Sequence, residues 1–300
     1  MTALKHLLVH VNDEATSGHA MTIAAGLAKA HDARITVLMV TAPAGSAGLG
    51  LSGESAALAH QFVQAQREAL LETARRLEAL VRQRYDVPID FQTVEGGEVE
   101  CLQESSRLAD LVVTSQRDPE GRGGLSAGQF GRLLLGAACP LLVVPHIGPE
   151  PDAVGDPEML ERALVAWADT RESARALRDA LPLLAAAKEV HVVSFSESGV
   201  EGAAQRRSAL EGVAAYLARH GIRPTTSVLS QGEPSVGERM RRGWVPDVAA
   251  AEAMLSHAAD IHADFLVMGG YGHSRLRQLV LGGVTRTVLD TMTVPVLMSH

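Results

Sequence analysis

The sequence predicts an α/β protein with two tandem doubly wound domains, each a five-stranded parallel sheet flanked by helices on both faces. Two observations carry this prediction. The chain repeats its own pattern at a spacing of about 155 residues. Within each half, continuous apolar runs alternate with helical patterns, which is typical of parallel strands buried on both faces. Right-handed crossovers then restrict the topology to a doubly wound sheet.

Strands are predicted wherever a short apolar run is bounded by turn residues. In the first half these runs cover residues 7–11, 34–40, 89–94, 108–113 and 139–145, with helices over 17–31 and 55–84. In the second half they cover residues 163–167, 189–195, 225–229, 262–267 and 294–298, with helices over 171–187, 202–220 and 284–292. The fourth strands match best, since Leu-Ala-Asp-Leu-Val-Val at 108–113 mirrors His-Ala-Asp-Phe-Leu-Val at 262–267.

The boundary between the halves is expected in residues 147–157, which hold three prolines and two glycines. This gives a first domain over 1–147 and a second over 158–300. A segment without a counterpart in the first half, residues 231–246, is interpreted as an exposed insertion or as a basic lid or interaction loop, since it carries three arginines and a tryptophan.

Composition excludes several classes of protein. Net charge is −8 and the isoelectric point about 5.8, which disfavours a general nucleic-acid or anionic-membrane surface. Hydrophobic residues make up 46% of the chain but aromatic residues only 3%, so the core must consist of Ala, Leu and Val. Cys101 and Cys139 form no CxxC pair, and no signal peptide or membrane-length apolar run is found. A cytoplasmic location is therefore expected.

The most informative motif is a pair of glycine turns near the end of the chain. Gly269 and Gly272 follow an apolar strand, and Gly282 and Gly283 open a new helical segment. Glycines lack side chains that would keep backbone N–H groups from an anion, and the free N–H groups of a helix N-terminus favour one. Thr285 could add a hydroxyl donor. The pattern predicts a phosphate-binding loop, with a tight loop and a helix cap as the alternative.

The arrangement Gly269-x2-Gly272-x9-Gly282, flanked by Val267-Met268 and Val284-Thr285, resembles the nucleotide-binding signature of the universal stress proteins. The resemblance covers almost the whole chain twice, as in the tandem type of this family. It implies the adenine nucleotide alpha hydrolase-like fold, pairing of domains through their last strands, and homodimers of such chains. It also implies binding of ATP or AMP, with or without Mg²⁺, in one branch of the family, whereas another branch binds no nucleotide.

Carried over to this sequence, the resemblance assigns two groups of site residues. The phosphate loop would comprise Met268, Gly269, Gly272, Gly282, Gly283, Val284 and Thr285, and the adenine side would comprise Ala166, Trp167, Ala168, Asp169 and Phe195. Two departures stand out. Gly283 replaces the usual Ser or Thr, and Ala168 stands where the family has Asp, with Asp169 one residue later.

In the first half the phosphate loop is absent. Residues 114–124 carry no glycine at the first two motif positions, and Asp118 and Glu120 would repel phosphate. Asn12 stands where the family often has Asp. The first half is therefore expected to be structural, so that at most one nucleotide site is predicted, in the second half.

Other chemistry finds little support in the sequence. His257 and His262 are five residues apart on a predicted helix, whereas helical metal ligands prefer a spacing of three or four. His6 and His10 are interpreted as satisfied, partly buried histidines. No GxSxG elbow or Walker A lysine occurs, so no catalytic residue and no metal site is predicted. The alternatives to nucleotide binding are a structural or interaction protein without nucleotide, or an adaptor that binds metal or lipid.

Overall fold

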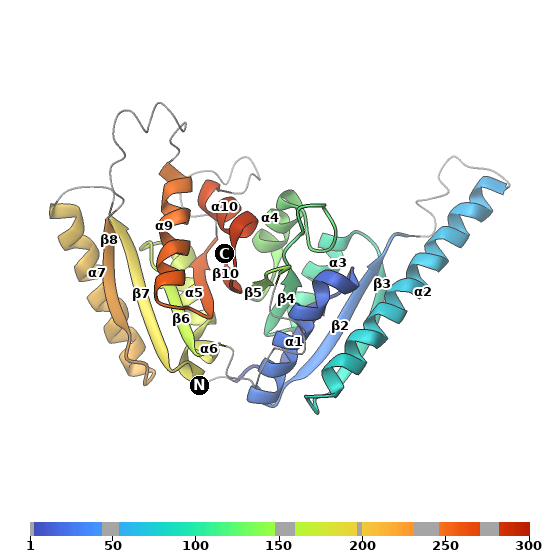
Figure 1. The fold of residues 1–300 in the computed structure, drawn as a ribbon, viewed down its shortest axis with the longest axis horizontal. Helices are drawn as coiled ribbons and strands as arrows, with labels where there is room; N and C mark the ends of the chain where they lie inside the picture. The colour runs from blue at the N-terminus through green and yellow to red at the C-terminus, as the bar shows by residue number, and fades with distance from the viewer. Residues whose placement is uncertain (1–2, 44–53, 148–159, 197–199, 231–245, 271–281) are drawn as a thin grey trace. The chain divides into compact units, whose positions relative to one another are not determined.

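Figure 1 presents a computed structural model of the chain, which describes residues 3–43, 54–147, 160–196, 200–230, 246–270 and 282–300. The chain divides into two compact units, Ala3–Pro157 and Glu158–His300, named here the first and the second domain. Gly272 and the insertion at 231–245 lie outside the described residues. No helix in the described ranges is both long and apolar enough to cross a bilayer.

The first domain contains a five-stranded parallel sheet in the order β3-β2-β1-β4-β5. Its strands are β1 (His6–His10), β2 (Arg34–Thr41), β3 (Ile89–Glu95), β4 (Leu111–Ser115) and β5 (Leu141–Val144). Its helices are α1 (Glu14–His31), α2 (Glu54–Arg82), α3 (Glu98–Ser105) and α4 (Ala127–Gly136), with a short 3-10 helix η1 (Ser106–Leu108).

The second domain repeats this arrangement in the order β8-β7-β6-β9-β10, again with every pair parallel. Its strands are β6 (Arg162–Ala166), β7 (Glu189–Ser196), β8 (Thr225–Ser230), β9 (Phe265–Gly269) and β10 (Val296–Ser299). Its helices are α5 (Arg171–Asp179), α6 (Leu181–Ala186), α7 (Val200–Arg219), α9 (Pro246–Asp260) and α10 (Gly283–Thr291). The predicted fold class is confirmed.

One aspartate plays the same part in both domains, which explains why the fourth strands match best in sequence. Asp110 accepts hydrogen bonds at 2.7 and 2.9 Å from the two backbone N–H groups at the start of β1. Asp264 accepts them at 3.1 and 2.8 Å from the two N–H groups at the start of β6. The carboxylate thus fixes where the first strand of each sheet begins.

Several predicted bounds differ from the structure, among them those of the strand predicted over 262–267, which is β9 (Phe265–Gly269). Two of the differences have a clear local cause. The helix predicted over 171–187 is split at Ala180 into α5 and α6, because Pro182 provides no N–H and its ring displaces the carbonyl one turn earlier. The strand predicted from residue 108 begins at Leu111, since residues 106–108 form η1 and Leu108 is exposed.

Topology decides which helices lie on which face of the second sheet. From β6 the chain moves outward to β7 and β8, and then returns to the other side of β6 to form β9 and β10. With right-handed crossovers, α5, α6 and α7 cover one face and α9 and α10 cover the other. The direct packing of α9 on α10 agrees with this. The strand order reverses between β6 and β9, where doubly wound folds bind ligands beyond the carboxyl ends of the strands.

Candidate functional site

The predicted site residues lie around the reversal point between β6 and β9. Ala166, Met268 and Gly269 belong to the carboxyl ends of these two strands, and Phe195 lies near the end of β7. Because all strands are parallel, these ends meet at one edge of the sheet. Trp167 follows β6 directly. The structure therefore brings most of the described members of the predicted set to the same edge.

The N-terminus of α10 carries no side-chain cap from the described residues. Gly282 occupies the N-cap position with φ of −59°, and within the described part of the chain no side chain accepts a hydrogen bond from the first turn. A Cβ placed on Gly282 would meet no described atom within 4 Å. The first turn contains no acidic residue. Backbone N–H groups and the positive end of the helix dipole are thus left for an acceptor from outside the described residues.

The N-terminus of the corresponding helix in the first domain is capped by side chains of the protein. Ser126 is the N-cap of α4 and forms a capping box with Gln129, whose amide oxygen accepts from the backbone N–H of Ser126 at 3.0 Å. The hydroxyl of Ser126 accepts from the backbone N–H of Gln129 at 3.4 Å. In α4 the protein itself therefore supplies a side-chain acceptor for the first turn, and α10 has no such acceptor among the described residues.

Gly269 has a packing reason to be glycine. A Cβ at this position would stand 2.5 Å from the backbone N of Ser173 and 2.6 Å from the carbonyl carbon of Glu172. Both atoms belong to the first turn of α5, so the end of β9 and the start of α5 approach each other only because residue 269 has no side chain. This close contact explains Gly269 without any ligand.

The remaining phosphate-loop residues lie in different surroundings. Met268 is buried in the sheet. Gly283 and Val284 are half-buried in the first turn of α10. Thr285 is 4% exposed and shares the buried face of α10 with Val288 and Leu289. Its hydroxyl is therefore placed toward the core, so the helix backbone is the better donor to an anion.

On the expected adenine side, Ala168 and Asp169 are exposed, and Asp169 has a left-handed backbone with φ of 52°. The next residue, Thr170, caps α5 through a hydrogen bond with Ser173. Trp167 is half-buried and lines a pocket between α5 and α7. The turn between Trp167 and α5 is therefore one residue longer than the corresponding turn of the first domain, in which Asp13 caps α1.

A carboxylate that the sequence analysis did not single out lies beside the glycine loop. Glu172 is next to Gly269, and its side chain is 12% exposed. Burial raises the pKa of Glu172, but hydrogen bonds from its own N–H and from Thr170, with the charges of Arg171 and His300, outweigh burial and lower the pKa below 4.5. An ionised group therefore stands at this edge. An acid in the first turn of the helix after the first strand is the signal that could have indicated it.

In the first domain the loop after β4 folds on itself. Arg122 pairs with Asp118 at 2.8 Å, and Arg117 donates to the carbonyl of Gly121 at 3.0 Å. Gly124 has φ of 51°, and a Cβ on it would stand 2.5 Å from the carbonyl oxygen of Ser115. Arg117 and Arg122 are thus engaged within this loop.

A buried polar cluster occupies the carboxyl ends of β1 and β4 in the first domain. His10 is 1% exposed, with Nε2 at 3.1 Å from Oε1 of Glu98. Asn12 and Gln129 donate to the same carboxylate at 3.2 and 2.8 Å. Burial raises the pKa of Glu98, but the hydrogen bonds from His10, Asn12 and Gln129 and the charge of His10 outweigh it, so the pKa lies below 4.5. His10 is fully rather than partly buried, and its Nδ1 lies 3.3 Å from the hydroxyl of Thr114.

The metal candidates weighed in the sequence do not form a site. Helix α9 ends at Asp260, so His257 and His262 do not share one helix as predicted. His262 lies beyond the end in a left-handed conformation with φ of 52°, because the chain turns there into β9. Across the described residues, no group of three or more His, Cys, Asp and Glu side chains could hold a metal ion.

Comparison with protein families identifies the chain. The model of the universal stress protein family matches it twice, over residues 3–145 and 159–300. The chain belongs to the universal stress protein family. Its two domains are tandem copies of the fold of this family, and the resemblance expected from the glycine motif is confirmed.

Known relatives agree with this assignment. A universal stress protein of Archaeoglobus fulgidus has a similar structure, with a TM-score of 0.68, 18% identity and coverage of 98% of this chain and 97% of its own. A functionally unknown protein of Pseudomonas aeruginosa PAO1 gives a TM-score of 0.57, 17% identity and coverage of 99% and 92%. The universal stress protein Slr1230 of Synechocystis is 46% identical over 48 residues, which span 16% of this chain and 17% of that protein.

Proposed function

We propose that this universal stress protein is a regulatory adenine-nucleotide-binding protein of the cytoplasm, and that ATP or AMP binds in its second domain. The observation that carries the proposal is the uncapped N-terminus of α10 behind Gly282, together with the capping box that closes α4 in the first domain. Within one duplicated fold, one helix N-terminus is satisfied by the protein and the other is left for a ligand.

The phosphates would lie against the backbone N–H groups of Gly282, Gly283 and Val284, in the field of the α10 dipole. Gly282 has no steric neighbour among the described atoms and no unusual φ, so packing against the described residues does not account for its being glycine. Close approach of a ligand would account for it. Gly272 and the residues after it would complete the loop, and the exposed turn at Ala168 would lie beside the base.

The charge of Glu172 affects whether the nucleotide binds as its Mg²⁺ complex or in the free form. Its ionised carboxylate lies beside Gly269 and repels phosphate oxygens. A Mg²⁺ ion bound to the phosphates would reverse the sign of this interaction, and oxygen ligands such as carboxylate and phosphate are those that Mg²⁺ prefers. We therefore expect Mg-ATP to bind more tightly than free ATP. No catalytic residue is proposed.

A second candidate function has its own observation. The contact of Gly269 with the first turn of α5 shows that one motif glycine is required by the fold alone. A structural or interaction protein without nucleotide would keep it for this reason. Either function would act through a protein partner whose identity is open, and the family resemblance adds domain pairing through the last strands and homodimers.

Gly282→Asp separates the two functions. Aspartate is a favoured N-cap residue, so it would satisfy α10 and leave stability unchanged or slightly raised, while its carboxylate would occupy the place of a phosphate. The matched control is Gly128→Asp in α4, where an added Cβ also meets nothing within 4 Å.

Isothermal titration with ATP, ADP and AMP, with and without Mg²⁺, is the measurement. We expect the wild type and Gly128→Asp to bind at least one nucleotide with a Kd of about 1 mM or tighter. Gly282→Asp should bind at least about tenfold more weakly at equal thermal stability. If none of the three nucleotides binds to the wild type, the structural function is favoured instead. If Gly282→Asp binds as well as the wild type, the site at the N-terminus of α10 is refuted.

A further inference from the structure

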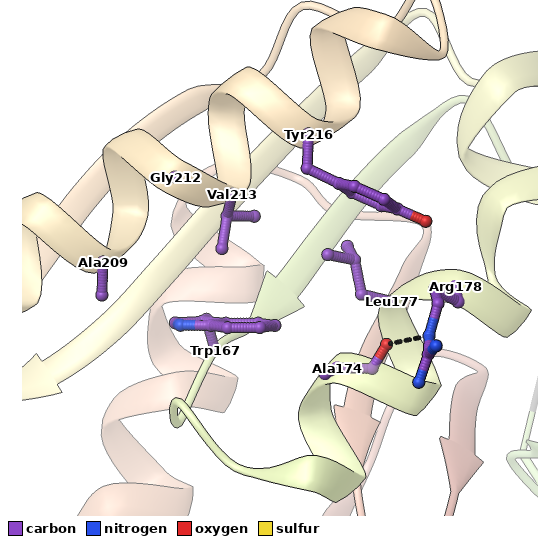
Figure 2. Close-up of a pocket in the computed structure, with 8 residues that line it drawn as sticks. All are labelled: Trp167, Ala174, Leu177, Arg178, Ala209, Gly212, Val213 and Tyr216. Carbon is purple, nitrogen blue, oxygen red and sulfur yellow. Dashed lines mark hydrogen bonds between the residues drawn. The ribbon is translucent and has the colours of Figure 1, made fainter.

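A pocket of about 300 Å³ lies between α5 and α7 in the second domain. Figure 2 shows Trp167 on one side of it, Leu177 of α5 beside it, and Val213 and Tyr216 of α7 on the other side. The pocket lies on the face of the sheet that α5, α6 and α7 cover, whereas α10 belongs to the opposite face. Its lining includes none of the phosphate-loop residues, and it shares only Trp167 with the expected adenine side.

The space exists because α7 carries a glycine where a larger residue would fit. Gly212 lines the pocket, and a Cβ on it would meet no atom within 4 Å. Its φ is not in the left-handed region, and glycine inside a helix is less favourable than alanine. In the first domain, α1 and α2 are packed together, since a Cβ on Gly18 would stand 3.8 Å from Leu77. The pocket is thus a feature of this second domain and not a necessity of the fold.

Three polar groups border this apolar space. The indole Nε1 of Trp167 is buried and has no hydrogen-bond partner among the described residues. A buried donor without a partner is unfavourable, and an acceptor on a ligand would satisfy it. Arg178 donates from Nε to the carbonyl of Ala174 at 3.2 Å, which fixes its guanidinium at the rim. In Figure 2 the Tyr216 hydroxyl and Arg178 lie toward one side, and the Trp167 nitrogen lies toward the other.

We propose that this pocket binds a planar aromatic carboxylate of one or two fused rings that carries a hydrogen-bond acceptor at the end opposite the carboxylate. The volume is about twice that of the roughly 150 Å³ cavity known to hold benzene, which suits a bicyclic ring. Trp167 and Tyr216 contact the ring, Arg178 pairs with the carboxylate, and Nε1 of Trp167 donates to the acceptor.

The probes for this proposal are three compounds that differ in one group each. 6-Hydroxy-2-naphthoate carries both polar groups, 2-naphthoate lacks the acceptor, and 2-naphthol lacks the carboxylate. Binding is measured by isothermal titration to the full chain. We expect 6-hydroxy-2-naphthoate to bind with a Kd below about 1 mM and each of the other two to bind about three- to tenfold more weakly.

Variants test the assignment to this pocket. Gly212→Leu places a side chain into the empty space and should weaken binding at least about tenfold, while Gly212→Ala controls for helix propensity and should bind like the wild type. Arg178→Gln, at an exposed position, should weaken the two naphthoates about three- to tenfold and leave 2-naphthol unchanged. Thermal melting verifies that each variant is folded, and the Arg178 comparison still decides the matter if Gly212→Leu does not fold.

Three further outcomes would overturn the proposal. The first is the absence of binding of all three probes to the wild type, and the second is equal binding to Gly212→Leu. The third is competition, because a probe displaced by saturating ATP would share the nucleotide site and the pocket would not be a separate one. A wild type that binds the probes but no nucleotide would refute the proposed function and leave this inference standing.

Discussion

Replacing Gly269 by alanine tests the structural role assigned to this residue. Ordinary van der Waals contact begins at 3.4 Å, and the new Cβ would stand 2.5 Å from the backbone N of Ser173, so the shortfall is 3.4 − 2.5 = 0.9 Å. The atoms it meets are backbone atoms of α5, which cannot rotate away as a flexible side chain could. The first turn of α5 must therefore move away from β9. Overpacking of this kind costs about 1–3 kcal/mol, and we expect the upper half of that range.

The assay is thermal and urea unfolding of the full chain. For a domain of this size, 1 kcal/mol lowers the Tm by about 3 °C, so Gly269→Ala should lower the Tm of the second domain by roughly 6–9 °C. The control is Gly212→Ala in the same domain, where the new methyl group meets nothing and the helix gains up to about 1 kcal/mol. If Gly269→Ala were as stable as Gly212→Ala, the close approach of β9 and α5 would be refuted.

Three further predictions concern the polar groups at the carboxyl edges. Folding lowers the pKa of Glu98, so its contribution to stability is present above pH 4.5 and is lost as the pH falls through the pKa of the folded state. The unfolding free energies of the wild type and of Glu98→Gln should therefore converge on acidification. An equal difference between the two proteins at pH 7 and at pH 3 would contradict this. Ser126→Ala should destabilise the first domain by about 1 kcal/mol in urea titrations, which an unchanged midpoint would refute. Glu172→Gln should strengthen the binding of free ATP about two- to fivefold and reduce the effect of Mg²⁺ in calorimetric titrations. Weaker binding of free ATP by this variant would show that the carboxylate does not repel the phosphates.

The strands and their parallel, doubly wound arrangement follow from local patterns, and the sequence was sufficient to predict them. Continuous apolar runs are typical of strands buried on both faces of a sheet, and right-handed crossovers restrict the topology. The order of the strands within each sheet was not predicted and comes from the structure. The break between α5 and α6 is encoded just as locally, because Pro182 cannot continue a helix. It could have been predicted from the same sequence.

The side-chain environment of the site could not be predicted to the same depth. His10 and Glu98 meet across 88 positions of sequence, and nothing near either residue indicates the other. Gly269 and Gly282 look alike in a motif, yet only the structure distinguishes a glycine that faces a helix backbone from one that faces open space. The burial of Thr285 likewise depends on how α10 is rotated on its sheet. Such facts arise from packing between distant elements.

Native mass spectrometry of the full chain loaded with Mg-ATP or AMP tests the central claim most directly, because it counts ligands per polypeptide. The account predicts one nucleotide for each 31.7 kDa chain, present in Gly128→Asp and absent in Gly282→Asp. Two nucleotides per chain would contradict the expectation that the first domain binds none. A wild-type chain that carries none, or a Gly282→Asp chain that still carries one, would contradict the site at the N-terminus of α10.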